Sequence, residues 1–403
     1  MNLVIFLVVF VCAVFDYGEG EHELLCEPPS GDIGPSNFAS TCTQMGGEPF
    51  CCNFHEKTAL AEGGKLIVYA GGDAPDQQDG NRAGFEAAFP GVKVEIIVDF
   101  SKYHDARIDH QLETDTLIPD VAHLQTLQDF PRWKKEGVLL NYKPIGWNRV
   151  YKGLKDSDGA YTGVFMIAFS TNVNTELLPN EASWPIKATD YLKPEFKDKL
   201  VVTYPNDDDA VLFWFKQVVD KYGFDYLYKF KEQNPKLVRG TDTAIVMVTN
   251  STLGYVATMT ADGGLNSQDK FGPTFPRFIA PENDPFVIWA QFAAIFKKAK
   301  HPETAKLYLS WLLDKKQQEQ PAAWSWSVRD DVSPPAPFKS IWSYPSNHID
   351  FFNFMKNREA VEIFKHQIEI IFGPPEGPNP NERDRTLGMY PSVGYRPADS
   401  TPP

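Results

Sequence analysis

The stretch from Lys65 to Phe100 reads KLIVYAGGDAPDQQDGNRAGFEAAFPGVKVEIIVDF and decides the fold class. Its first part, KLIVYAGG, is a short apolar run ended by glycines, which is typical of a buried strand. NRAGFEAAFPG follows, with Phe85 and Phe89 at helical spacing before a Pro-Gly stop. VKVEIIVDF then predicts a second strand. This order of strand, helix and strand indicates an α/β sheet with parallel strands.

The alternation continues towards the C-terminus. We predict a helix near Tyr103 to Thr114, a strand around Pro119 to Leu124, a helix from Leu127 to Glu136, and an apolar strand in GAYTGVFMIAFSTNV. A second alternating region, about Asn174 to Thr274, contains DKLVVTYP, KLVRGTDTA and STLGYVATM.

Two long helical patterns complete the regular part of the chain. Residues 285–320 predict an amphipathic helix with a break at His301-Pro302, and a further helix is expected from about Phe351 to Ile371. The chain therefore leaves one α/β lobe, builds a second and returns, and two such crossings imply a hinge and a cleft that closes on a ligand. We divide it into a signal peptide (1–20), a Cys-bearing appendage (21–62), lobe 1 (63–168 and 279–372), lobe 2 (169–278) and a Pro-rich tail (373–403).

The N-terminal residues predict export. MNLVIFLVVFVCAVFDYGEG contains an apolar run from Leu3 to Phe15 that is too short to span a bilayer but fits a signal-peptide core. Small residues favour cleavage before Glu21, so we expect a secreted, extracellular protein with no membrane span after cleavage.

Cleavage would leave four cysteines, Cys26, Cys42, Cys51 and Cys52. An even number in the first part of a secreted chain predicts disulfides that staple a small N-terminal extension. A bond between the adjacent Cys51 and Cys52 would be strained, which leaves Cys26 to Cys51 with Cys42 to Cys52, or the crossed alternative. A zinc site is disfavoured because CxxC spacing is absent. The sequon at Asn250 is a candidate for N-glycosylation.

Composition narrows the classes of partner. The 403 residues carry a formal net charge of −14 and no basic stripe, which argues against nucleic acid and anionic membrane surfaces. We therefore expect a small-molecule or ion ligand, no cofactor and a monomeric chain, with a protein partner as the alternative.

The order of several segments resembles a known family. KLIVYAGG, AAFPGVKVEIIVDFS, IPDVAHLQT, FKDKLVVTYPNDDDAVLFWF, LVRGTDT, AAIFKKAKHPETAKLYLSWLL and SWSVRDDVSPP, within roughly Lys65 to Phe372, are similar to extracellular solute-binding proteins of ABC importers, ferric-iron-type group. The resemblance implies the two-lobed periplasmic-binding-protein-like II fold and a non-catalytic protein that holds a small ligand at the hinge. Ferric members place two adjacent tyrosines in the second lobe, whereas the equivalent stretch here has Tyr255 alone, so iron binding is not carried over.

Candidate ligand residues follow predicted strands or begin helices, where such folds bind ligands. Arg239 is a candidate for pairing with an anionic group, and turn chemistry alone would also explain many of these residues. Aromatic residues such as Trp289 would either fill the core or stack on an organic cation. The ligand set that we predict is Gly72, Asp73, His123, Gln125, Thr126, Asp207, Asp208, Arg239, Thr241 and Thr243.

The run Asp207, Asp208 and Asp209 opens a predicted helix. Capping would account for all three, because carboxylates near a helix N-terminus accept N–H bonds and interact favourably with the macrodipole. Successive helical side chains diverge by about 100°, so at most one or two can face a ligand, and that ligand would be a cation or an ammonium group.

Signatures of common enzymes are missing: GxSxG, HExxH, GxxxxGK[ST] and GxGxxG do not occur. We therefore expect no catalytic residue. Two alternatives stay open, a secreted eukaryotic effector or venom-type protein that reuses this scaffold to act on a host protein, and an extracellular hydrolase with paired carboxylates.

Overall fold

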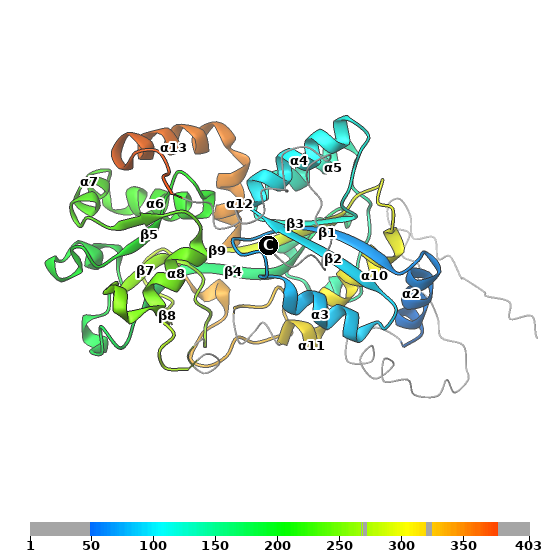
Figure 1. Cartoon of the computed structure of the whole chain (residues 1–403), viewed down its shortest axis with the longest axis horizontal. Helices are drawn as coiled ribbons and strands as arrows, with labels where there is room; N and C mark the ends of the chain where they lie inside the picture. Colours follow the sequence, from blue (N-terminus) through cyan, green and yellow to red (C-terminus); the bar gives the residue numbers. More distant parts are fainter. Residues whose placement is uncertain (1–48, 267, 269–271, 320–324, 378–403) are drawn as a thin grey trace, which may run out of the picture.

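The computed structural model describes residues 49–266, 268, 272–319 and 325–377 (Figure 1). The signal peptide, Cys26, Cys42 and most of the Pro-rich tail lie outside these residues. Cys51 and Cys52 fall within a helix, α2 (Pro49–Ala61), which packs against α10 (Pro302–Leu312) of lobe 1. This helix was not expected in the appendage, where the sequence shows little hydrophobic period.

Lobe 1 begins with the expected parallel unit. Strand β1 (Lys65–Gly71) pairs with β2 (Lys93–Asp99) in parallel register from Lys65 opposite Lys93 to Gly71 opposite Asp99, with α3 (Asp79–Ala88) between them in sequence. Phe85 and Phe89 are both buried, which confirms the helical spacing read from the sequence.

The remaining elements of lobe 1 follow the predicted order closely. They are α4 (Ser101–Glu113), β3 (Val121–Leu124) parallel to β1, and α5 (Asp129–Glu136).

Residues 287–295 correct the sequence-based prediction. They form strand β9 (Val287–Ile295) rather than the first half of a helix, and the helix begins only at Pro302 with α10, followed by α11 (Lys315–Glu319). Every residue of β9 is buried, because the strand lies between β3 and β4 (Thr162–Val173) and helices pack against it. An apolar run that is buried on both faces has no two-residue alternation, so its sequence looks the same as that of a buried helix.

Strands β4 and β9 connect the two lobes side by side. They pair antiparallel from Thr162 opposite Ala293 to Phe169 opposite Val287, with a bulge between Gly163 and Phe165. The sheet order in the described chain is β2-β1-β3-β9-β4-β7, with β8 (Arg277–Ile279) also on β4 and β7 (Ala257–Ala261) antiparallel to it. One sheet therefore runs through both lobes.

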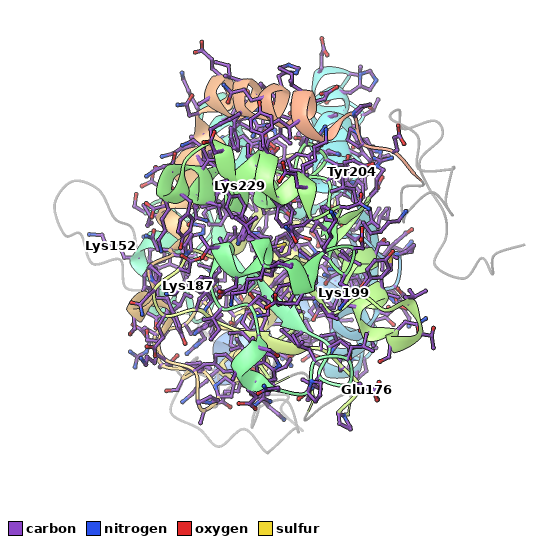
Figure 2. The ribbon with its side chains drawn as sticks, turned by 90° about the vertical axis from the view of Figure 1, so that its left-hand side faces the viewer. Lys152, Glu176, Lys187, Lys199, Tyr204 and Lys229 are labelled. Atoms are coloured by element: carbon purple, nitrogen blue, oxygen red, sulfur yellow. The ribbon has the colours of Figure 1, made fainter. Side chains whose placement is uncertain are left out.

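Lobe 2 adds a short parallel pair, β5 (Val201–Thr203) and β6 (Lys236–Val238). Its helices are α6 (Asp209–Tyr222), α7 (Asp225–Glu232) and α8 (Thr241–Thr249). Figure 2 views this end of the molecule, where Lys187, Lys199 and Lys229 lie on the exposed surface.

The last two helices, α12 (His348–Lys356) and α13 (Arg358–Phe372), pack against α6 of lobe 2, and α13 also packs against α7. The sequence placed them with lobe 1, whereas Figure 1 shows α13 above lobe 2. Asp209 on α6 binds Arg358 at 2.8 Å and Lys365 at 3.1 Å, and α13 also buries apolar residues such as Phe364 in the core. No described helix is long and apolar enough to cross a membrane.

Candidate functional site

A cavity of about 680 Å³ lies between the two lobes. This size suits a small organic molecule. Its wall contains residues that directly follow β1, β2, β3, β5, β6 and β7, so the carboxyl ends of strands from both lobes meet there. This is the position at which open α/β sheets bind ligands.

Lobe 1 contributes three short segments to the wall. Gly71 ends β1 and Gly72 and Asp73 follow it, Ser101 and Lys102 begin α4, and Gln125 and Thr126 follow β3. The backbone at Gly71 passes so close to α4 that a Cβ there would lie 2.0 Å from the Oγ of Ser101. A side chain at this position would therefore require the Ser101 hydroxyl to move.

Lobe 2 presents two helix N-termini and one loop. Asp207, Asp208 and Asp209 follow β5 and begin α6, Gly240 to Asp242 follow β6 and begin α8, and Asp262 follows β7.

The three consecutive aspartates have three different sets of partners. Asp207 accepts hydrogen bonds from the Nζ of Lys102 at 2.6 Å and from the Nε of Arg239 at 2.9 Å. Burial alone would raise the pKa of Asp207, but these two cations outweigh it and lower the pKa. Asp207 is therefore a charged carboxylate that joins the lobes.

Asp208 is the N-cap of α6. Its Oδ1 accepts hydrogen bonds from the backbone N–H groups of Ala210 at 2.8 Å and Val211 at 2.9 Å, and the amide of Gln125 in lobe 1 donates to it at 3.3 Å. Burial, and then the negative charge of Asp73, raise the pKa of Asp208 to about 7.

Asp209 takes the third role, in the first turn of α6. Burial alone would raise its pKa, but Lys365 and Arg358 from α13 lower it. The capping expectation is thus met by Asp208, which also lies on the cavity wall.

Two further carboxyls on the wall are buried without a cationic neighbour. Asp262 accepts backbone N–H bonds from Ala168 and Gly264, and burial raises its pKa to about 7. Burial and the nearby Asp129 raise the pKa of Asp105, which is hydrogen-bonded to Asp129. In the described part of the chain, neither Asp262 nor Asp105 has Lys or Arg within 4.0 Å.

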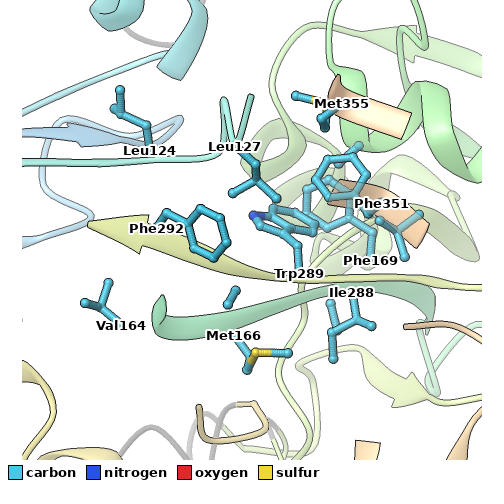
Figure 3. Close-up of a cluster of buried hydrophobic side chains, with 14 of the residues drawn as sticks. Leu124, Leu127, Val164, Met166, Phe169, Ile288, Trp289, Phe292, Phe351 and Met355 are labelled. Atoms are coloured by element: carbon cyan, nitrogen blue, oxygen red, sulfur yellow. The ribbon is translucent and has the colours of Figure 1, made fainter. Parts of the chain in front are cut away.

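The floor of the cavity is the apolar surface of the two connecting strands. Val164, Met166 and Phe169 on β4 and Trp289 on β9 line it. Figure 3 shows Trp289 and Phe169 beside Phe351 of α12, with Met166 extending to the opposite side of the strands. Trp289 is fully buried and contacts Phe169 with ring centroids 4.9 Å apart. It therefore belongs to the core and at the same time forms part of the cavity floor.

Polar contacts cross the cleft directly, and they join residues of lobe 1 to the N-terminus of a lobe 2 helix or the loop before it. Besides Lys102 with Asp207 and Gln125 with Asp208, the Nη2 of Arg239 donates to the hydroxyl of Tyr103 at 3.3 Å, and Asp73 accepts from Thr241. The two lobes are thus held close together by polar contacts at the mouth of the cavity.

The predicted ligand residues fall into two groups. Gly72, Asp73, Gln125, Thr126, Asp207, Asp208 and Thr241 line the cavity, whereas His123, Arg239 and Thr243 do not. The ring of His123 is fully buried against Phe165 and Tyr308, and burial lowers its pKa to about 3. His123 lies inside β3, where alternate side chains face the interior of the lobe.

Sequence reasoning missed several wall residues. Asp262 carries the same signal as the predicted residues, since it directly follows a strand and precedes two glycines. Lys102, Arg358 and Lys365 had no comparable signal, because their place on the wall depends on how the lobes and α13 pack. Trp311 also lines the cavity, and its indole N–H has no partner among the described residues.

The predicted glycosylation site, Asn250, and Tyr255 of lobe 2 both lie away from the cavity wall. Asn250 is exposed at the end of α8, and its side-chain oxygen accepts a hydrogen bond from the hydroxyl of Thr252 at 2.7 Å. Tyr255 packs against a small apolar cluster of lobe 2 and is not on the cavity wall. No group of three or more His, Cys, Asp or Glu side chains in the described ranges is placed to hold a metal ion.

Comparison with known proteins gives a consistent result. The family model for bacterial extracellular solute-binding proteins matches residues 66–319. No curated protein sequence matches the chain significantly.

Several solved structures are similar in fold. For the periplasmic binding protein P5PA the TM-score is 0.61 at 18% identity, over 76% of this chain and 99% of that chain. For iron-bound HitA from Pseudomonas aeruginosa the TM-score is 0.60 at 15% sequence identity, and the match covers 75% of this chain and 99% of that chain. For AfuA from Actinobacillus pleuropneumoniae, bound to fructose-6-phosphate, the TM-score is 0.61 at 16% sequence identity, and the match covers 76% of this chain and 98% of that chain. These matches confirm the two-lobed α/β architecture.

Proposed function

Because this chain belongs to the family of bacterial extracellular solute-binding proteins, we propose that the cavity between its lobes is the solute site and that the solute is an organic cation. Solute binding follows from the family and favours a binding protein over the secreted effector. The chemical class of the solute is inferred from the charges on the cavity wall.

The distribution of charge carries this proposal. Three cations line the described wall, and each is already paired: Lys102 with Asp207, and both Arg358 and Lys365 with Asp209 and Glu362. In contrast, Asp208, Asp262 and Asp105 lie on the wall without a cationic partner. A buried carboxylate is costly unless a positive charge compensates it, so the wall favours a cationic solute over an anionic one.

The apolar floor favours an organic cation over a metal ion. Phe169 and Met166 give the wall an apolar surface that suits the hydrocarbon part of a solute, whereas the ring of Trp289 is fully buried. Metal ions bind to several converging oxygen or nitrogen ligands, and the described residues do not form such a set.

Polar groups at the lobe 1 end of the wall would orient the solute. The indole N–H of Trp311 and the hydroxyl of Ser325 are buried and have no hydrogen-bond partner among the described residues. Both residues line the cavity, so a solute whose hydroxyl or carbonyl oxygens reach these two groups would satisfy them. The solute that fits best is thus an amine that also carries oxygen acceptors.

Thermal unfolding and calorimetry with a small panel test the proposal. We expect amines such as spermidine and glucosamine to raise Tm, and citrate and inorganic phosphate to leave it unchanged. Asp208→Asn and Asp262→Asn should weaken amine binding. Asp220→Asn is the matched control, because Asp220 lies on the same helix as the Asp208 cap but is exposed and paired with Lys216. Binding of phosphate in preference to amines would contradict the proposal.

Secretion is the second part of the proposal. It rests on the apolar run from Leu3 to Phe15 and on the small residues before Glu21. N-terminal sequencing of the exported protein should begin at Glu21. Intact mass before and after reduction should differ by four hydrogen atoms if Cys26, Cys42, Cys51 and Cys52 form two disulfides. Delivery of the solute to an ABC importer, and glycosylation at Asn250 in a eukaryotic host, remain further proposals.

A further inference from the structure

Helix α8 begins in the cleft without a cap of its own. Its N-cap residue is Gly240, at φ 78°, which has no side chain to accept a hydrogen bond from the first turn. The first backbone N–H groups of a helix have no partner within it and carry a partial positive charge. They therefore require an acceptor from elsewhere in the protein.

Asp73 of lobe 1 provides that acceptor. Its Oδ2 accepts hydrogen bonds from the backbone N–H of Thr241, from the hydroxyl of Thr241 at 2.6 Å and from the backbone N–H of Asp242 at 3.2 Å. Asp73 lies 168 residues before Thr241, in the loop after β1. By contrast, α6 is capped by its own Asp208. One lobe thus caps a helix of the other.

The loop that carries Asp73 is held in place. The backbone N–H of Asp73 donates to the Oε1 of Gln77 at 2.9 Å, and the N–H of Gly72 donates to the carbonyl of Asp99 at 3.0 Å. Because Asp73 is fixed to lobe 1 and Thr241 to lobe 2, these hydrogen bonds exist only while the lobes are close together.

We propose that Asp73 is a residue that both closes the cleft and determines specificity, because its carboxylate takes the place at the start of α8 that an anionic solute would otherwise occupy. Closure then satisfies the first turn of α8 with a group of the protein itself. The inference rests on the proposed two-lobe solute site and adds a reason why that site rejects anions.

The surrounding charges support the exclusion of anions. A carboxylate or phosphate that approached this helix end would meet Asp73 and Asp208, both on the cavity wall. The cation on the facing helix α4, Lys102, is already bound to Asp207 at 2.6 Å. An anion would thus have to displace Asp73 without gaining a cation in exchange.

Hydrogen exchange of the α8 amides tests the closing role without any solute. In Asp73→Ala, the amides of Thr241 and Asp242 should exchange about tenfold faster than in the wild type, because their acceptor is lost. Small-angle scattering should also show a larger radius of gyration for this variant. Asp76→Ala is the matched control, because Asp76 is an exposed aspartate of the same loop and its removal changes the net charge equally. Asp73→Asn removes the charge with little change of shape. In this variant the amides of Thr241 and Asp242 should exchange at a rate between those of the wild type and Asp73→Ala.

Equal exchange in Asp73→Ala and Asp76→Ala would overturn the closing role. The specificity role has its own readout, which is the binding of inorganic phosphate measured by calorimetry. Asp73→Ala should bind phosphate about tenfold more tightly than the wild type or Asp76→Ala. Unchanged phosphate binding would overturn the exclusion of anions. Neither result depends on amine binding, so a failure of the proposed solute class would be recognised separately.

Discussion

Asp207 and Asp208 are neighbours in the sequence, yet the protein shifts their pKa values in opposite directions. Lys102 and Arg239 lower the pKa of Asp207, whereas burial and the charge of Asp73 raise the pKa of Asp208 to about 7. The difference arises because one carboxylate faces the two cations and the other caps a helix beside the cavity. Adjacent residues thus supply a fixed charge and a titratable one.

Amine binding should depend on pH near neutrality. If the ionised Asp208 binds the amine, affinity should fall about tenfold between pH 8 and pH 6, because protonation removes the charge. Calorimetry with spermidine at the two pH values measures this change. Asp208→Asn should bind the amine more weakly, and its affinity should change less with pH. The pH dependence that remains in this variant would come from Asp262. The other charged groups on the wall that act on Asp208 are Asp73, Asp209 and Lys102. An unchanged pH profile in Asp208→Asn would contradict this role.

The same carboxyl should affect stability with a defined sign. The folded-state pKa of Asp208 lies above the ordinary value of 3.8, so the folded protein holds this proton more tightly than the unfolded chain. Its contribution to the free energy of unfolding is therefore greatest below about pH 4 and is lost as pH rises to about 7. Urea unfolding of the wild type and Asp208→Asn at pH 5 and pH 8 measures the difference, and the variant should gain relative stability at pH 8.

The ion pairs of Asp207 should contribute unequally to stability. The Asp207 side chain is 7% exposed and Arg239 is 16% exposed, whereas Lys102 is 40% exposed. Asp207→Asn should thus lower the free energy of unfolding by about 2 kcal/mol, because it leaves the guanidinium without its partner. Lys102→Met should cost less than about 1 kcal/mol, as is usual for exposed pairs. Urea unfolding measures both variants. If Asp207→Asn and Lys102→Met lose the same free energy of unfolding, Arg239 finds another partner when Asp207 is replaced.

Gly163 marks the closest approach between the connecting strands. A Cβ at this position would lie 2.8 Å from the Cβ of Ala290 on β9 and 3.1 Å from the carbonyl oxygen of Leu154. Gly163→Ala should therefore destabilise the fold by about 1–3 kcal/mol through overpacking. Gly80→Ala is the control, because nothing lies within 4 Å of a Cβ at Gly80 in α3, and the change should stabilise the helix by about 0.5–1 kcal/mol. Thermal unfolding of both variants gives the comparison.

Two buried tryptophans separate a structural role from a binding role. The indole N–H of Trp133 donates to Asp109 at 2.8 Å, whereas that of Trp311 has no partner in the described chain and lies on the cavity wall. Replacement by Phe removes a similar volume at both sites. Trp133→Phe should thus lose about 1 kcal/mol more stability than Trp311→Phe, while only Trp311→Phe should weaken amine binding. The opposite pattern in unfolding and calorimetry would remove Trp311 from the solute site.

The fold was readable from the sequence where hydrophobic periods were distinct. The β1-α3-β2 unit has a clear strand, helix and strand order, and the structure has the same order. Strand β9 was misread because an apolar run that is buried on both faces gives no alternation. The position of α13 involves long-range contacts, among them its ion pairs with Asp209, and such contacts cannot be seen in a local sequence pattern.

The site was predictable to the extent that it follows strand ends. Asp73, Gln125 and Asp208 were chosen for that reason, and all three line the cavity. The contact between Asp73 and Thr241 was not predictable, because it joins residues on different lobes. His123 was chosen by the same rule, but it is the third residue of β3 and faces the interior, so an error of one or two residues in a strand boundary changes the result.

The pairing of β4 with β9 limits how the lobes can move. Two of the connections between the lobes, β4 and β9, are strands, and they are hydrogen-bonded to each other over the stretch from Thr162 to Phe169. Sliding one strand along the other would break the whole ladder, since a shift by one residue turns every side chain to the opposite face. Twisting keeps the ladder intact, because paired strands are naturally twisted. A motion that preserves this ladder is thus a torsion of one two-stranded ribbon, and stiffness in either strand changes how the ribbon twists.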